Sequence, residues 1–181
     1  MTYLALLRGV NVGGKHKLAM KDLAALLEGL GCAKVKTYIQ SGNAIFDAPA
    51  SVVAGLPHTL HAAILKKAGF EAPVVLRSAA QMAAALKANP FLAKGADPDH
   101  LHVGFLADKP AASALKALDP ARSPGDVFTV LGQEVYFHLP NGVARTKLTN
   151  AYFDSTLKTV CTMRNWRTVG ALHALAAEPA A

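Results

Sequence analysis

The chain is poor in cysteine and acidic residues and has no long apolar run, and each scarcity excludes a class of protein. Its only two cysteines, Cys32 and Cys161, lie far apart beside apolar residues, which predicts two buried, reduced thiols and no disulfide framework. No apolar run approaches the roughly 20 residues of a membrane helix. The first such run, residues 3–7, ends at Arg8 and is too short for a signal peptide. We therefore expect a cytoplasmic protein without a membrane partner.

Basic residues outnumber acidic ones. The 181 residues include 19 Lys and Arg against 12 Asp and Glu, for a formal net charge of +7 at pH 7. This surplus favours an anionic small molecule or nucleic acid as a partner, although it is equally typical of a basic solvated surface. At 52% hydrophobic and 17% charged residues, the chain can bury a core. No motif contains paired carboxylates for acid–base chemistry, so the sequence leaves open whether the protein is an enzyme.

Hydrophobic periodicity predicts one order of elements twice. In the first half, strands are expected at residues 3–7, 34–40, 43–47 and 72–77, and helices at 20–30 and 57–68. In the second half, strands are expected at 100–106, 126–131, 134–139 and 159–163, and helices at 110–118 and 147–158. A capping box, Ser78-x-x-Gln81, opens a further helix to Lys87, and Asn165 can cap a last helix to about Ala176.

Each half therefore has the order β-α-β-β-α-β followed by an extra helix, which is the order of a ferredoxin-like unit. We predict an α+β protein of two ferredoxin-like alpha-beta plaits. The first plait covers residues 1–78, a linker helix and loop cover 79–99, and the second plait with a C-terminal helix covers 100–181. A single mixed sheet is the alternative. The repeat lies in element order more than in residues.

Glycines and cations concentrate directly after the first strand. Glycine lets a backbone approach a ligand closely, and exposed N–H groups beside Lys and Arg attract anions. In a plait, this loop lies at the same sheet edge as the hairpin at residues 40–43. The candidate ligand-binding residues at this edge are Arg8, Asn11, Gly13, Gly14, Lys15, Lys17, Gln40, Ser41 and Asn43.

The same loop partly matches a P-loop. Gly9-x4-Gly14-Lys15 follows a strand, but His16 stands where Ser or Thr would hold magnesium. The helical period begins only near Met20. Asp47, the nearest candidate for the acidic residue of a Walker B motif, is expected at the far end of its strand from the loop. These departures favour a nest of amides at the paired glycines, with an ordinary glycine turn as the alternative.

Connectivity groups a second basic cluster in the second half, at the edge where the third and fourth strands end. Its expected members are Arg145, Lys147, Thr149, Arg164, Asn165 and Trp166. Among them, the candidate ligand-binding residues are Lys147, Arg164, Asn165 and Trp166. The tryptophan can stack on a base or anchor a helix. Seven histidines are present, but neither close pair has a Cys or carboxylate at ligand spacing, so no metal site is predicted.

Four ordered motifs carry a resemblance to a known family. They lie at residues 6–15, 37–43, 147–149 and 162–168. On these motifs the chain resembles the uncharacterised bacterial family DUF1697 over nearly its whole length. The resemblance implies paired alpha-beta plaits and brings no established activity, substrate or cofactor. His16 stands where the family more often has Asn.

These observations favour binding of a phosphate-bearing ligand, a nucleotide or nucleic acid, at the glycine-rich basic loop. One alternative is a phosphoryl- or nucleotidyl-transfer enzyme in the same cleft, with His16 as the only nearby general acid–base group. Another is a protein-interaction module that uses the open sheet faces. The sequence identifies no cofactor, and it leaves the oligomeric state and the packing of the two plaits open.

Overall fold

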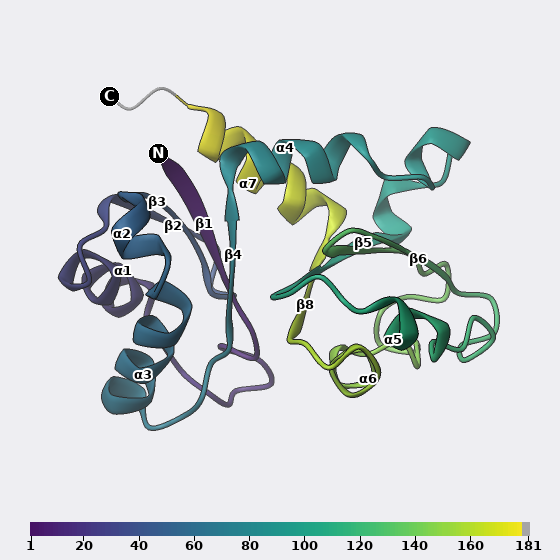
Figure 1. Cartoon of the computed structure of the whole chain (residues 1–181), viewed down its shortest axis with the longest axis horizontal. Coiled ribbons are helices and arrows are strands. Elements are labelled where there is room, and N and C mark those ends of the chain that lie inside the picture. Colours follow the sequence, from purple (N-terminus) through teal and green to yellow (C-terminus); the bar gives the residue numbers. More distant parts are fainter. Residues whose placement is uncertain (179–181) are drawn as a thin grey trace. The chain divides into compact units, whose positions relative to one another are not determined.

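Two four-stranded antiparallel sheets organise the chain (Figure 1). The structure, a computed structural model, describes residues 1–178. Unit 1 combines Met1–Ala83 with the C-terminal segment from Leu172, and unit 2 is Ala84–Ala171. The first sheet belongs to unit 1, which contains β1 (Thr2–Leu7), α1 (Met20–Gly29), β2 (Ala33–Tyr38), β3 (Asn43–Asp47), α2 (Ala50–Val53), α3 (Leu56–Ala68) and β4 (Val74–Ser78).

The second sheet belongs to unit 2. This unit contains the 3-10 turns η1 (Leu92–Lys94) and η2 (Pro98–His100), then β5 (Leu101–Leu106), α5 (Ala112–Lys116), β6 (Val127–Leu131), β7 (Glu134–His138), α6 (Asn150–Leu157) and β8 (Cys161–Asn165). Helix α4 (Ala79–Lys87) follows the first sheet, and α7 (Trp166–Ala177) follows the second. The strand orders β2-β3-β1-β4 and β6-β7-β5-β8 are identical, so the predicted pair of ferredoxin-like plaits is confirmed.

The core of unit 1 forms where α1 and α3 cover one face of the first sheet (Figure 1). Leucines three and four residues apart give each helix an apolar stripe, which explains why these segments are helical. The buried side chains include Leu23 and Leu27 of α1, Leu60 and Ile64 of α3, and Ala5, Leu7 and Phe46 of the sheet. Cys32 is part of this core, and Cys161 is part of the core of unit 2; both are buried, reduced thiols, as expected.

Side-chain caps set the starts of three helices. The capping box is complete: the backbone N–H of Ser78 donates to Gln81 Oε1 at 2.8 Å, and that of Gln81 donates to Ser78 Oγ at 3.2 Å. Asn165 Oδ1 accepts from the N–H of Thr168 at 2.8 Å, which confirms the predicted cap of α7. Thr149 caps α6, so this helix begins at Asn150 and not at residue 147 as expected.

The two plaits repeat one detail at the ends of their last strands. Arg77 lies one residue before the cap of α4, and Arg164 lies one residue before the cap of α7. Each Nη1 donates to the carbonyl of the preceding residue, at 2.8 Å to Leu76 and 2.9 Å to Met163. Because one local arrangement occurs at equivalent positions, the repeat extends beyond element order to side-chain geometry.

The structure departs from the expected elements where segments are short. Helix α2 was not expected, and the expected loop at residues 91–99 contains η1 and most of η2. Helix α5 has only five residues, fewer than the expected span of 110–118. The last strand begins two residues later than expected, and Thr159 Oγ1 accepts from the N–H of Asp108 at 3.0 Å.

The two compact units also differ from the expected domains. The expected boundaries were 1–78, 79–99 and 100–181. The observed division instead falls inside α4, after Ala83, and inside α7, before Leu172. The expected linker is thus divided between the units.

Candidate functional site

The basic loop at residues 8–17 and the hairpin at residues 39–42 lie side by side at one edge of the first sheet. The N–H of Leu7 donates to the carbonyl of Gly42 at 2.8 Å, and Asn11 Nδ2 donates to the carbonyl of Gln40 at 2.8 Å. β1 pairs with β3 from Thr2↔Asp47 to Leu6↔Asn43, which brings both turns to the same end. The adjacency expected from connectivity is therefore present.

The tip of the loop is a small hairpin of its own. The N–H of Asn11 donates to His16 O at 3.0 Å, and the N–H of Lys15 donates to Val12 O at 3.0 Å. Gly13 and Gly14 have φ values of 58° and 74°, the left-handed pair that a type I′ turn requires. Turn geometry alone accounts for both glycines, so the predicted amide nest is not needed to explain them.

Asn11 fastens the loop to its surroundings. Its φ is 56°, which asparagine tolerates better than most residues. Its Oδ1 accepts from the N–H of Leu18 at 2.9 Å, and its Nδ2 donates to Leu18 O at 2.8 Å as well as to Gln40 O. With the side chain committed to three backbone groups, Asn11 holds loop and hairpin together and has little capacity left for a ligand.

His16 is also held in place. Its ring stacks on Phe70 with 4.8 Å between centroids, and its Nδ1 lies 3.1 Å from the carbonyl of Gly9. The acid of the partial P-loop match, Asp47, lies at the opposite end of β3 and accepts from Thr2 Oγ1 at 2.8 Å. Helix α1 begins only at Met20. The structure thus departs from a P-loop in the same three ways as the sequence: in His16, in the remote Asp47 and in the late start of α1.

The cations differ in exposure. Arg8 is half-buried, and its N–H donates to Pro73 O at 2.9 Å, whereas Lys15 and Lys17 are exposed. Neither lysine forms an ion pair or hydrogen bond through its side chain with any residue in the range 1–178. The first 21 residues contain four Lys or Arg and no Asp or Glu. The loop itself is therefore positive, and its two lysines are open to solvent.

The hairpin residues take different positions. Gln40 is exposed and Ser41 is half-buried, but Asn43 is fully buried and its Nδ2 donates to Tyr38 O at 3.2 Å and Ser41 Oγ at 2.8 Å. Asn43 thus stabilises the hairpin from inside. Ile39, at the tip, has a φ of 49° while its side chain is 51% exposed. A β-branched residue rarely adopts this conformation, so the tip is strained.

The second cluster is only partly assembled. Thr149 and Asn165 line one cavity of about 380 Å³ in unit 2. Arg164 does not line it, because side chains alternate along β8 and those of Met163 and Asn165 face the cavity. Burial lowers the pKa of Arg164 to about 10, which leaves its guanidinium charged at neutral pH. Lys147 and Arg145 are close in sequence to residues of the cavity, but both are exposed and neither lines it.

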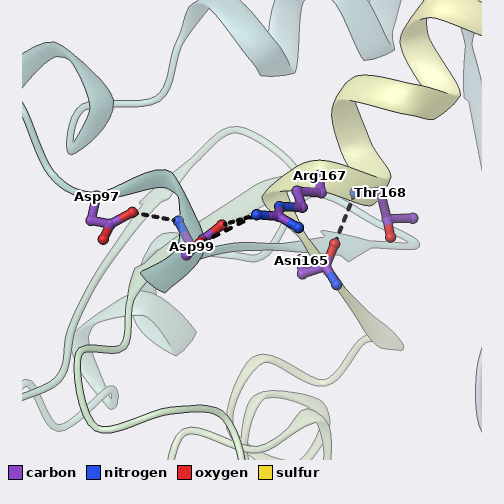
Figure 2. Close-up of polar contacts among 5 residues, drawn as sticks. All are labelled: Asp97, Asp99, Asn165, Arg167 and Thr168. Carbon is purple, nitrogen blue, oxygen red and sulfur yellow. Dashed lines mark hydrogen bonds and ion pairs between the residues drawn. The ribbon is translucent and has the colours of Figure 1, made fainter.

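Trp166 lies at a different, smaller hollow of about 220 Å³, with Pro98, Asp99 and Arg167. Figure 2 shows the polar contacts here: Arg167 Nη2 lies 3.1 Å from an oxygen of Asp99, and Asn165 caps the helix at Thr168. The Arg167 and Asp99 side chains are 81% and 59% exposed, so this ion pair contributes little stability. The helix-cap interpretation of Asn165 is therefore confirmed.

Sequence reasoning missed most of the residues that line the larger cavity, His102 and Asn150 among them. Asn150 Oδ1 is buried and has no hydrogen-bond partner among the residues described, whereas His102 is hydrogen-bonded with the backbone of His100. A signal was available, because β5 lies beside β8 in a plait, and the register pairs His102 with Asn165. Asn150 had no such signal, since it was expected inside a helix.

None of the helices within residues 1–178 has the length and apolar character needed to cross a membrane. No group of three or more His, Cys, Asp or Glu side chains in the same range is arranged to hold a metal ion.

The fold defines an α+β protein with two tandem ferredoxin-like plaits. The chain belongs to the DUF1697 family, whose model, described as a protein of unknown function, matches residues 1–136. The structure is similar to that of the conserved bacterial protein SP0830 from Streptococcus pneumoniae, with a TM-score of 0.71 and 24% identity over 98% of each chain. No curated protein matches the chain. The comparisons establish family and fold.

Proposed function

We propose that the loop at residues 8–17 binds a phosphate-bearing ligand, either a nucleotide or a nucleic acid. The observation that carries the proposal is the state of Lys15 and Lys17, which are exposed and lack an ionic partner among residues 1–178. An unpaired ammonium group is a ready partner for phosphate, since it is a compact charge with three donors. The first 21 residues contain no Asp or Glu that could pair with these ammonium groups.

Two features support recognition at this edge beyond charge. The bonds from Asn11 and Leu7 to the hairpin hold the loop in a defined position, which reduces the ordering cost of binding. Gln40 is exposed on the adjacent turn and offers an amide to a ligand's polar edge. By contrast, phosphoryl transfer in this cleft gains no support, because His16 is stacked and Asp47 is remote.

The test compares two double variants that remove the same charge. Lys15→Ala with Lys17→Ala changes the loop, whereas Lys94→Ala with Lys116→Ala changes two exposed lysines of unit 2. Binding of a labelled single-stranded oligonucleotide, with ATP as competitor, is followed by fluorescence anisotropy across a salt series. The loop variant should reduce the salt slope by about 1 to 2, because each phosphate contact contributes roughly 0.7 to 0.9 to it.

The control variant should bind nearly as the unmodified protein does. Equal loss of affinity in both double variants would mean that only the overall charge matters. Absence of measurable binding of both probes at low salt would also refute the proposal. Circular dichroism of each variant separates a folding defect from a binding defect.

A further inference from the structure

The two plaits differ in how an equivalent edge strand is protected from pairing with another chain. β2 and β6 are edge strands at the same end of the strand orders β2-β3-β1-β4 and β6-β7-β5-β8. β2 carries Lys34 and Lys36, and its register with β3 shifts between Ala33 and Lys36. Charged side chains and bulges are the devices by which proteins keep an edge strand from pairing further. The β2 edge of the first sheet is therefore protected.

β6 has none of these devices. Its sequence, Val-Phe-Thr-Val-Leu, contains no charge and no proline, and its register with β7 is unbroken from Val127↔His138 to Leu131↔Glu134. Val127 and Leu131 are 48% and 42% exposed. The carboxylate next to the strand, that of Asp126, belongs to a buried residue and accepts from Ser123 Oγ at 2.7 Å. A regular, apolar and exposed edge strand is a ready template for another strand.

The turn after β6 determines which of its backbone groups face outward. This turn has two residues, so Leu131 and Glu134 form a hydrogen-bonded pair. Hydrogen-bonded and non-hydrogen-bonded pairs alternate along an antiparallel ladder, so the backbone N–H and C=O groups of Phe128 and Val130 point away from β7. No hydrogen bond joins these groups to any residue in the described range 1–178. The edge therefore offers donors and acceptors that are ready to pair.

We propose that β6 pairs antiparallel with β6 of a second copy of the chain, so that the dimer has one continuous sheet. The apolar pattern of the strand is the same in both directions about Thr129. A two-fold axis at this residue places Val127 opposite Leu131 and Phe128 opposite Val130, with Thr129 opposite its own copy. Phe128 and Val130 then exchange backbone hydrogen bonds with the second copy, which gives each outward group a partner.

The direction of the side chains supports a second copy as the occupant. Phe128 packs against the core of unit 2, as does Val130, so by alternation Val127 and Leu131 lie on the opposite face of the sheet. In the two-fold register the two exposed side chains of each copy meet those of the other on one face and cover them. A single five-residue strand from each copy makes a small interface, so we expect a dissociation constant between about 1 μM and 1 mM.

Sedimentation velocity over a series of protein concentrations up to about 1 mM tests the proposal. Val127→Lys with Leu131→Lys places like charges opposite each other in both symmetric pairs, and it should weaken dimerisation by about tenfold or more. Val127→Glu with Leu131→Lys changes the same positions but places opposite charges there, so the dimer should persist. Leu115→Lys with Val143→Lys is the matched control, since it adds the same charge at exposed positions of unit 2 outside β6.

Hydrogen exchange provides a second measurement, on the unmodified protein. The amides of Phe128 and Val130 should exchange fast in dilute solution and become protected as the protein concentration rises. The amide of Thr129, which bonds to β7, should be protected at every concentration. Dimerisation with these two amides still unprotected would place the interface elsewhere and refute the proposal.

Three outcomes of the sedimentation experiment would also overturn the proposal. The first is a chain that stays monomeric up to about 1 mM. The second is a lysine–lysine variant that dimerises like the control, and the third is a folded glutamate–lysine variant that does not dimerise. Circular dichroism of each variant identifies a folding defect. The Lys15→Ala and Lys17→Ala double variant should dimerise normally, so dimerisation and phosphate binding at the loop can fail separately.

Discussion

Gly42→Ala tests whether the contact between hairpin and loop depends on the absence of a side chain. Gly42 has a φ of 74° and is buried beneath the loop, where its carbonyl accepts from the N–H of Leu7. A Cβ at this position would lie 2.8 Å from Leu7 Cβ and 3.4 Å from Val10 Cβ. These atoms belong to short, buried side chains close to the backbone, so the neighbours cannot move aside without shifting the strand end.

The size of the effect follows from two contributions. Forcing alanine into the left-handed conformation costs roughly 1–2 kcal/mol. Overpacking a filled core costs about 1–3 kcal/mol more. We therefore expect Gly42→Ala to lower the free energy of unfolding by about 2–5 kcal/mol, a large share of the roughly 5–15 kcal/mol typical of a folded protein.

Gly14→Ala is a closely matched control. Gly14 has the same φ of 74°, but nothing lies within 4 Å of a Cβ built there. Its replacement should show only the conformational cost, about 1–2 kcal/mol. Urea unfolding of both variants, followed by circular dichroism, measures the difference. Equal destabilisation of the two variants would refute the steric argument.

Two further predictions concern single side chains. Because burial lowers the folded-state pKa of His102 below 6.5, the unfolded chain protonates first as pH falls, so stability is full above pH 6.5 and declines below it. His102→Gln should therefore lose less unfolding free energy than the unmodified protein between neutral and mildly acidic pH; equal losses would contradict this. Asn11→Ala removes three side-chain hydrogen bonds and should cost about 1–3 kcal/mol. Hydrogen exchange at residues 9–18 should then accelerate, and unchanged protection would show that the loop does not depend on Asn11.

The sequence predicted the fold well because the two plaits rely on local signals. The apolar period of α1 and the Ser78–Gln81 capping box are complete within a few residues, and both are present as expected. The short elements could not be predicted, since α2 has only four residues and no apolar period. The division into the two compact units could not be predicted, because it depends on contacts between distant parts of the chain, which no local pattern records.

The candidate site was predicted less completely. Connectivity alone placed the basic loop beside the hairpin, but it did not reveal that Asn11 and Asn43 use their amides to hold the turns. The second cluster was predicted from which strands end at one edge of the sheet, without considering which face each side chain is on. Because side chains alternate along β8, Arg164 lies on the opposite face from Asn165. Side-chain direction therefore decided which predicted neighbours share a cavity.

The way the basic loop is built has a consequence for its response to salt. Contacts made by Lys15 and Lys17 would weaken as ionic strength rises, because salt screens exposed charges. The turn that presents them is fixed by hydrogen bonds among backbone groups and one neutral amide. Ionic strength would therefore set how strongly the loop holds an anion without changing the arrangement of its donors.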